Sequence, residues 1–116
     1  FTEAKINMHG ESVNSKFGVV KFKLYDTQIN GGYAECCEAT VNGVPYTRGL
    51  NSAARINAGL DIIRTLQRYY DVYAPVFVDN KESVTELVNM DCQLVCLQVT
   101  GDKELVINNV KVKEVA

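Results

Sequence analysis

Asp79 is the residue of this sequence best placed to do chemistry, because it closes an apolar run, Val76-Phe77-Val78. Such a run is typical of a buried strand in a parallel sheet, and a carboxylate at its end faces the crevice where open α/β sheets bind ligands. In phosphate-loop ATPases that carboxylate holds the Mg²⁺ bridging the β and γ phosphates. The sequence therefore predicts a metal-binding role for Asp79. A turn that merely ends the strand is the competing interpretation.

A second candidate site lies at the start of a long amphipathic segment, at Asn51 and Ser52. The first N–H groups of a helix have no intrahelical partner and lie at the positive end of the helix dipole, so they can bind a phosphate. The amide of Asn51 and the hydroxyl of Ser52 would add donors. Either residue is also an ordinary N-cap, a role worth about 1 kcal/mol, so this signal is weak alone.

Residues 51–70 are predicted to form the one long helix. Apolar side chains recur there at helical spacing, with Arg and Asp residues mostly off the stripe. They are Ala53, Ile56, Leu60, Ile63 and Tyr70. Gly59 inside this helix costs about 1 kcal/mol relative to Ala, which suggests close packing at that point.

Two apolar segments without alternation, residues 76–78 and 93–99, are predicted to be central strands buried on both faces. Residues 83–89 between them are predicted to form a short helix. This order gives two neighbouring parallel strands in a βαβ unit.

Further upstream, the pattern predicts an antiparallel hairpin. Residues 19–25 alternate between apolar and charged side chains, residues 33–41 resume strand character, and Asn30-Gly31-Gly32 is a turn signal between them. At the other end of the chain, residues 104–107 and 110–112 are predicted to form a terminal hairpin.

The length of 116 residues allows one domain with one core. Residues 1–16 are weakly patterned and are interpreted as the end of a coiled-coil helix or as a disordered terminus. No run approaches the roughly 20 apolar residues of a membrane helix, and no signal peptide is visible. We therefore expect a cytoplasmic protein without membrane partners. Because the first residue is Phe1 and not Met, we expect an excised or processed segment.

A net charge of −2 gives the chain no broad attraction to nucleic acid. Two local clusters of cations, at residues 16–23 and 64–68, are interpreted as solvated faces.

Four cysteines raise the question of a zinc site. Cys36 and Cys37 are adjacent in a predicted strand and should point to opposite faces. Cys92 and Cys96 would lie roughly 13 Å apart along a strand, too far for one ion with Zn–S bonds of about 2.3 Å. The cysteines are therefore interpreted as small buried thiols in a reducing compartment.

Several motifs together resemble the C-terminal lobe of SMC-, RecF-, SbcC- and RecN-type ATPase heads, in a phage or mobile-element branch. Leu50-Asn51-Ser52-Ala53-Ala54-Arg55 is similar to a diverged Leu-Ser-Gly-Gly-Glu-Lys signature. Asp79-Asn80 resembles the Walker B end, and residues 83–86 resemble the D-loop. The branch is suggested by residues 43–46, 57–63 and 78–84. The resemblance covers roughly residues 21–107.

The resemblance implies an α/β fold with α+β features: the C-terminal half of a phosphate-loop ATPase head, with an antiparallel hairpin and a parallel βαβ unit around one long helix. It implies ATP and Mg²⁺ as cofactors and three partners: the N-terminal lobe of the same protein, a second head in a homodimer, and DNA, in repair or recombination. The phosphate loop G-x-x-x-x-G-K-[ST] is absent from these 116 residues. We therefore expect no activity from this chain alone.

The resemblance also assigns roles to individual residues. Asp79 would be the Mg²⁺ ligand, Asn51 and Ser52 would reach the γ-phosphate held by a partner head, and Ser83 and Glu86 would form the D-loop contact across the dimer.

The sequence departs from the family pattern at three points. Asn80 stands where a catalytic Glu is expected, and because an amide is no useful base, hydrolysis would require Glu82. Ser52-Ala53 replaces the glycine pair of the signature. Thr100 occupies the position of the expected switch His. The alternative to the ATPase interpretation is a non-enzymatic α+β binding or structural module.

Overall fold

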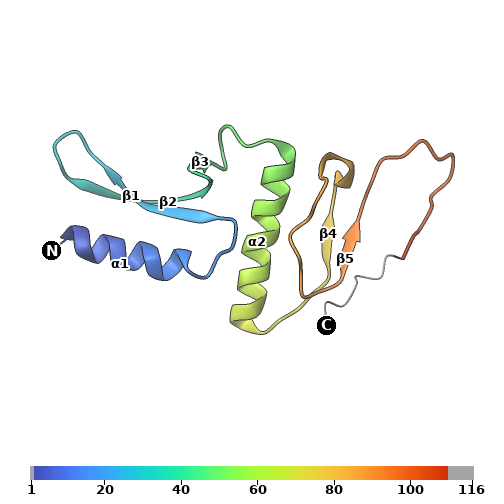
Figure 1. Cartoon of the computed structure of the whole chain (residues 1–116), viewed down its shortest axis with the longest axis horizontal. Helices are drawn as coiled ribbons and strands as arrows, with labels where there is room; N and C mark the ends of the chain where they lie inside the picture. Colours follow the sequence, from blue (N-terminus) through green and yellow to red (C-terminus); the bar gives the residue numbers. More distant parts are fainter. Residues whose placement is uncertain (1, 110–116) are drawn as a thin grey trace.

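Helix α2, Ser52–Tyr70, stands between two small sheets in this computed structural model, which describes residues 2–109 (Figure 1). The predicted helix is confirmed. The Asn51 side chain caps its start by accepting a hydrogen bond from the backbone N–H of Ala54 at 2.8 Å. Its end is an αL residue, Asp71, with φ of 53°. An αL residue after the last turn is a common way for a helix to stop.

The first sheet has the order β1-β2-β3, with β1 Lys21–Thr27, β2 Tyr33–Val41 and β3 Val44–Pro45. Strands β1 and β2 pair antiparallel, so the predicted hairpin is confirmed. The predicted start of β1 at Val19 is wrong by two residues. The N–H groups of residues 18–20 donate to the Asp61 carboxylate and not to a neighbouring strand.

A bulge interrupts the hairpin where one residue of β1, Leu24, faces two residues of β2, Cys36 and Cys37. Cys36 is partly buried, Cys37 and Cys96 are exposed, and Cys92 is partly buried. The interpretation of the four cysteines as buried thiols is therefore wrong. The predicted opposite orientation of the adjacent pair agrees with their different exposure.

Helix α1, Thr2–Asn14, runs alongside β1 in Figure 1 and confirms the helical interpretation of the first residues. Its last residue is fixed to the strand by two hydrogen bonds. The Asn14 side chain accepts from the N–H of Phe22 at 2.7 Å and donates to the same residue's carbonyl at 3.2 Å. An edge-to-face contact of the Phe17 and Phe22 rings at 5.0 Å adds to this junction. The helix is therefore attached firmly at its C-terminal end.

The second sheet pairs β4, Val76–Val78, with β5, Leu94–Cys96, in parallel, as predicted. Strand β5 is shorter than the predicted 93–99. The predicted helix at 83–89 is wrong: only a 3₁₀ turn, η1, Lys81–Ser83, is present, followed by irregular chain. The side chain of Asn57 on α2 fixes this segment by donating to the Glu86 carbonyl and accepting from the Val88 N–H, both at 2.9 Å.

The predicted terminal hairpin is not formed in the part that the structure describes, because residues 104–107 are irregular; residues 110–112 lie outside it. Within residues 2–109, no helix has the length and apolar character needed to cross a membrane.

The core is thin and lies on both sides of α2. Its buried apolar side chains are Val20, Ala58, Leu60, Val78 and Val84. Phe77 is 71% exposed, so the prediction that β4 is buried on both faces is wrong. The chain measures 60 × 31 × 21 Å with a radius of gyration of 17.9 Å. A compact domain of this length has a radius of roughly 13 Å. The chain is therefore much more extended than a self-contained domain.

Candidate functional site

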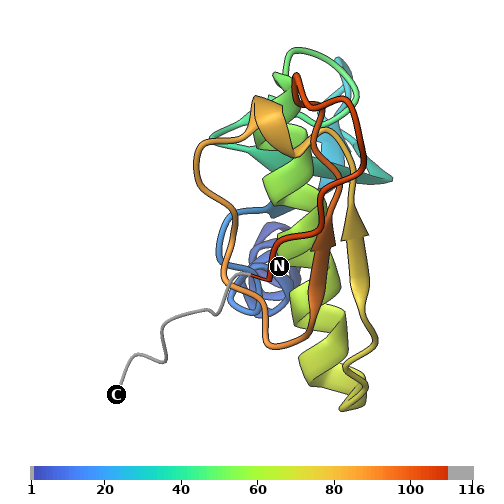
Figure 2. The ribbon, with the colours of Figure 1, turned by 90° about the vertical axis from the view of Figure 1, so that its right-hand side faces the viewer.

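The carboxyl end of β4 and the N-terminus of α2 lie at the same end of the molecule, as Figures 1 and 2 both show. A shallow groove of about 330 Å³ lies between the two elements, with Arg55, Gly59 and Ile63 of α2 on one side and Phe77 and Asp79 on the other; Asn51 and Ser52 are not among its lining residues. The structure thus brings two sequence-predicted elements, the strand-end carboxylate and the capped helix, to one surface.

Asp79 is exposed at the end of β4. Its Oδ1 accepts a hydrogen bond from the N–H of Asn80 at 2.8 Å. Among residues 2–109, no group hydrogen-bonds its Oδ2. One carboxylate oxygen is thus free to meet a cation, and the other is held by the turn. This arrangement is compatible with a single protein ligand to a hydrated Mg²⁺ ion.

Asn80 is a turn residue in this structure. Its φ of 59° is left-handed, a conformation that Asn adopts more readily than most residues. Its side-chain amide donates to the Ser83 hydroxyl at 3.1 Å, and that hydroxyl donates to the Asn80 carbonyl at 2.9 Å. The expected D-loop serine is thus engaged in closing η1.

The two acidic residues of this loop have separate positions. Glu82 accepts a hydrogen bond from the N–H of Val99 at 3.3 Å through its Oε2, which directs this carboxylate toward the chain after β5. Glu86 is exposed, and its backbone carbonyl accepts from Asn57. Within the described part of the chain, no three His, Cys, Asp or Glu side chains gather into a metal site. A metal at Asp79 would need its other ligands from water, nucleotide or another segment.

At the N-terminus of α2, the side-chain oxygen of Asn51 is already used as the cap, and Ser52 is exposed in the first turn. Arg55 lies one turn further, with its guanidinium 5.8 Å from the centre of the Tyr46 ring. Tyr46 also lines the groove. A cation on an aromatic face is thus placed beside the same groove as Asp79.

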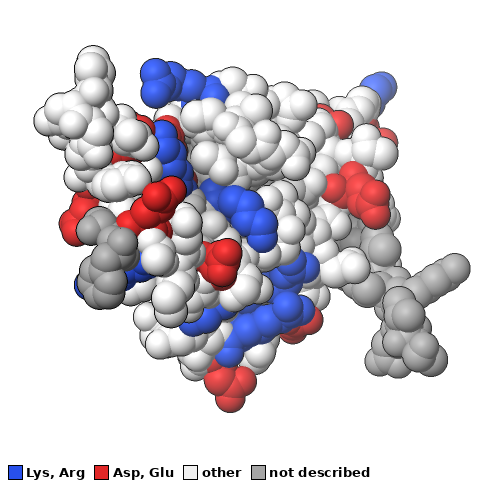
Figure 3. Space-filling model, turned by 60° about the vertical axis from the view of Figure 1, so that its left-hand side comes forward, with Lys and Arg blue, Asp and Glu red and all other residues white. Residues whose placement is uncertain are grey.

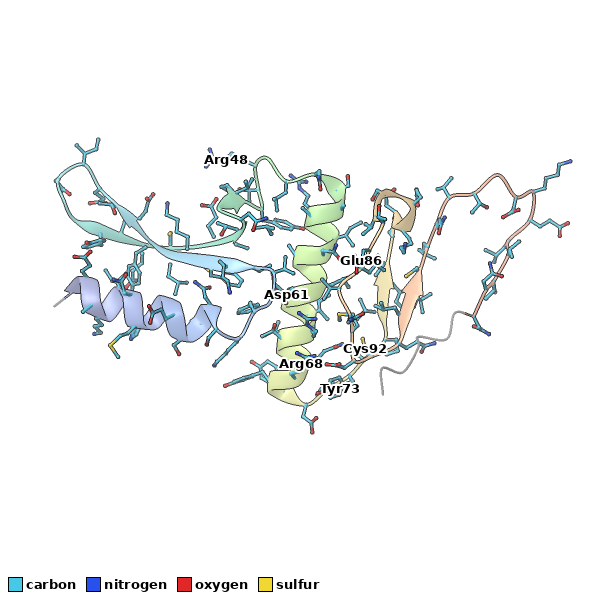
Figure 4. The ribbon with its side chains drawn as sticks, in the orientation of Figure 1. Arg48, Asp61, Arg68, Tyr73, Glu86 and Cys92 are labelled. Carbon is cyan, nitrogen blue, oxygen red and sulfur yellow. The ribbon has the colours of Figure 1, made fainter. Side chains whose placement is uncertain are left out.

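Sequence reasoning placed Asp61 on the polar face of α2, but the structure buries it completely. Its carboxylate accepts the N–H groups of Gly18, Val19 and Val20 at 3.1, 2.7 and 2.8 Å. Arg64 donates to it at 2.8 Å. In Figure 4, Asp61 lies on the side of α2 facing the turn before β1. We name this set of contacts the Asp61 clamp.

Burial alone would raise the pKa of Asp61, but the N–H groups of residues 18–20 and the Arg64 guanidinium outweigh it and hold that pKa below its ordinary value. The carboxylate is therefore charged at neutral pH. The i,i+3 spacing of Asp61 and Arg64 was visible in the sequence, but the backbone partners, over 40 residues away, had no local signal.

No protein-family model, curated protein or solved structure matches this chain significantly.

Proposed function

We propose that this chain is the C-terminal lobe of an ATP-binding head of the SMC, RecF, SbcC and RecN kind, which becomes functional when an N-terminal lobe completes its sheet. The observation that carries the proposal is a two-stranded parallel sheet whose strand β4 ends in Asp79, across a groove from residues 55–63 of α2. The signature-like, Walker B-like and D-loop-like motifs of the sequence support the same assignment.

The free edge of β4 supports a missing strand. Val76 donates to Gln93, and Leu97 donates to the Val78 carbonyl, both on the β5 side. Because alternate residues of a strand bond to opposite sides, the N–H and C=O of Phe77 point away from β5. No strand among residues 2–109 pairs there. An added parallel strand at this edge would satisfy these groups, and a segment packed on the exposed face of the sheet would cover the Phe77 ring.

In the completed head, Asp79 would hold Mg²⁺, whose charge would stabilise the negative charge of the transferring phosphoryl group. Asn51 and Ser52 would donate to a phosphate bound by a second head, and Ser83 and Glu86 would contact that head. Asn80 orders the turn after Asp79, and Glu82 is the nearest carboxylate along the chain that could polarise water. DNA is the partner that this assignment implies.

The test uses the full-length protein and the isolated chain in parallel. Asp79→Ala should abolish Mg²⁺-dependent ATP hydrolysis by the full-length protein, whereas Asp102→Ala, an exposed carboxylate of the 100–102 turn, should not change it. Calorimetry should detect no ATP binding to the isolated chain, which lacks the phosphate loop. Sub-micromolar ATP binding by the isolated chain would contradict the half-site assignment.

Two further substitutions, Asn80→Glu and Glu82→Gln, identify the residue that acts as general base in hydrolysis. A carboxylate at position 80 can raise hydrolysis because a positioned general base contributes roughly 10²–10⁴-fold. The left-handed backbone at position 80 opposes this gain, since it costs most residues about 1–2 kcal/mol. If Asn80→Glu leaves the rate unchanged and Glu82→Gln abolishes it, Glu82 is the working base.

The alternative is a non-enzymatic binding module. The observation in its favour is that Asn80 and Ser83 use their side chains to close a turn. A full-length protein without any nucleotide-dependent change in heat signal or stability would establish this alternative.

A further inference from the structure

A second depression, of about 490 Å³, lies between the end of α1 and the C-terminal half of α2. We name it the aromatic depression. Its lining includes Lys16, Phe17, Leu66, Arg68, Tyr69 and Tyr70. It is separate from the groove at Asp79, because the two share no lining residue: the groove takes residues 55–63 of α2 and the depression takes residues 65–70.

The aromatic rings here are exposed. Tyr69 and Tyr70 are 69% and 67% exposed, although each carries a large apolar ring. Their ring centres are 4.9 Å apart, with an angle of 87° between the planes. The edge of one ring therefore lies against a face of the other, and the remaining exposed ring surface is open to a flat partner.

Cations accompany these rings. Lys16 places its Nζ 5.5 Å from the centre of the Tyr69 ring. Lys21 donates to the carbonyl of Phe17 at 3.3 Å. Arg68 pairs with Asp91 through its Nε, at 2.7 Å, and this is its one ion pair within residues 2–109. None of the described Asp or Glu residues lines the depression. Figure 3 shows Lys and Arg side chains over the upper, central and lower parts of the face that it presents, with Asp and Glu side chains among them.

We propose that the aromatic depression binds single-stranded nucleic acid, with a base stacked on Tyr69 or Tyr70 and the adjoining phosphate near Lys16. Exposed rings beside cations suit a ligand that alternates flat aromatic groups with negative charges. Base–aromatic stacking with a basic track is the general chemistry of single-strand binding. A duplex keeps its bases inside the stack and offers only its phosphates to these rings. The proposal does not rest on the nucleotide-binding function proposed above.

Fluorescence anisotropy with labelled single-stranded DNA, single-stranded RNA and duplex DNA tests this on the full-length protein without ATP. Tyr69→Ala and Tyr70→Ala should each weaken single-strand binding by about fivefold to a hundredfold. Tyr69→Phe should retain it, because the ring remains. Tyr33→Ala, at an exposed tyrosine of β2, is the matched control and should bind as the unchanged protein does. Comparison of the affinities for single-stranded DNA and single-stranded RNA shows which of the two is the preferred ligand.

Lys16→Gln should lower the slope of log affinity against log salt by about 0.7, the value for one lost phosphate contact on a single strand. Lys103→Gln, in an exposed loop, should leave the slope unchanged. Asp79→Ala should bind the oligonucleotide normally, so that failure of the ATPase assignment and failure of this proposal are distinguishable.

Three results would overturn the proposal: no binding of either single strand, equal binding of both tyrosine variants and the unchanged protein, or equal losses on duplex and single strand. The second of these would indicate that the rings contact another protein segment. Circular dichroism spectra of the variants that match the unchanged protein would confirm that a loss of binding is not a loss of fold.

Discussion

The two sides of α2 differ in how completely their polar groups are hydrogen-bonded. On the side of α1 and β1, the Asp61 clamp uses both carboxylate oxygens, three backbone N–H groups and Arg64. On the side of β4, no strand among residues 2–109 pairs with the backbone groups of Phe77, and its ring is 71% exposed. The hydrogen bonds of the Asp61 clamp are thus complete, whereas the β4 edge is open, as we expect if a further segment covers that edge.

This comparison also separates structural charge from candidate functional charge. Asp61 is fully buried and both of its carboxylate oxygens accept hydrogen bonds, so its role is structural. Asp79 is exposed and keeps one oxygen free of protein donors within residues 2–109.

The largest effect is expected from Asp61→Ala. Removing the carboxylate leaves three N–H groups and the Arg64 guanidinium without their partner, and breaking a buried ion pair typically costs 3–5 kcal/mol. Urea unfolding followed by circular dichroism measures the loss. Asp26→Ala is the control, since its ion pair with Lys23 is exposed, and it should leave the midpoint unchanged. Equal midpoints for Asp61→Ala and the unchanged chain would refute the clamp.

On the open side, Phe77→Ser should affect association more than stability. Burying a Phe ring stabilises a contact by about 1.5–3 kcal/mol, so an edge that pairs with a second copy should lose roughly tenfold or more in affinity. We expect the isolated chain to self-associate in sedimentation measurements, and Phe77→Ser to shift it toward monomer. Ile29→Ser, at the exposed tip of the β1–β2 hairpin, is the control. A strictly monomeric chain at high concentration would favour a self-contained module.

Lowering the pH is expected to reduce the folding stability by an intermediate amount. The folded-state pKa of Asp61 is lowered, so its contribution to stability is present above the unfolded-state value of about 3.9 and is lost as the pH falls through the folded-state value. Stability should therefore fall steeply below about pH 4. Asp61→Asn should be less stable at neutral pH and should show a shallower acid slope. An identical slope in both proteins would show that other carboxylates control acid unfolding.

Sequence reasoning succeeded where the signal is local. The α2 helix has its cap and stripe within one segment, and the β1–β2 hairpin has its turn residues between two alternating runs. The parallel pairing of β4 and β5 followed from two apolar runs joined by a connection. These features depend on periodicity and short-range turn chemistry, which a single sequence contains.

The sequence-based predictions failed where a contact with a residue far away in the sequence determines the local structure. Residues 84–89 are irregular because the Asn57 side chain on α2 hydrogen-bonds to backbone groups of this segment. Residues 18–20 do not join β1 because their N–H groups donate to the Asp61 carboxylate. The exposure of Phe77 has a related cause: its apolar character matches a buried strand, but no segment among residues 2–109 covers its face of the sheet. Asp79 located the candidate site, whereas the contact between Arg55 and Tyr46 beside it, which joins two of the motifs named from the sequence, was found only in the structure.

The smallest effects compare two glycines, one on each side of α2. A Cβ on Gly18 would lie 2.8 Å from Arg64 Nη2 and 3.4 Å from Asp61 Oδ1, so Gly18→Ala must displace the guanidinium from the clamp. We expect a loss of about 1 kcal/mol, the size of one hydrogen bond. A Cβ on Gly59 would meet nothing within 4 Å, which contradicts the close packing predicted from the sequence.

In the isolated chain, Gly59→Ala should therefore stabilise α2 by about 0.5–1 kcal/mol, the helix-propensity difference between the two residues. In the full-length protein, the same substitution lies in the groove beside β4 and Phe77, and a lobe docked closely there would turn the gain into a loss. Thermal unfolding of Gly18→Ala and Gly59→Ala, each in the isolated chain and in the full-length protein, measures the four changes in stability. A gain of equal size for Gly59→Ala in the isolated chain and in the full-length protein would mean that nothing packs against this part of α2, and the open side would then be an ordinary solvent-facing surface.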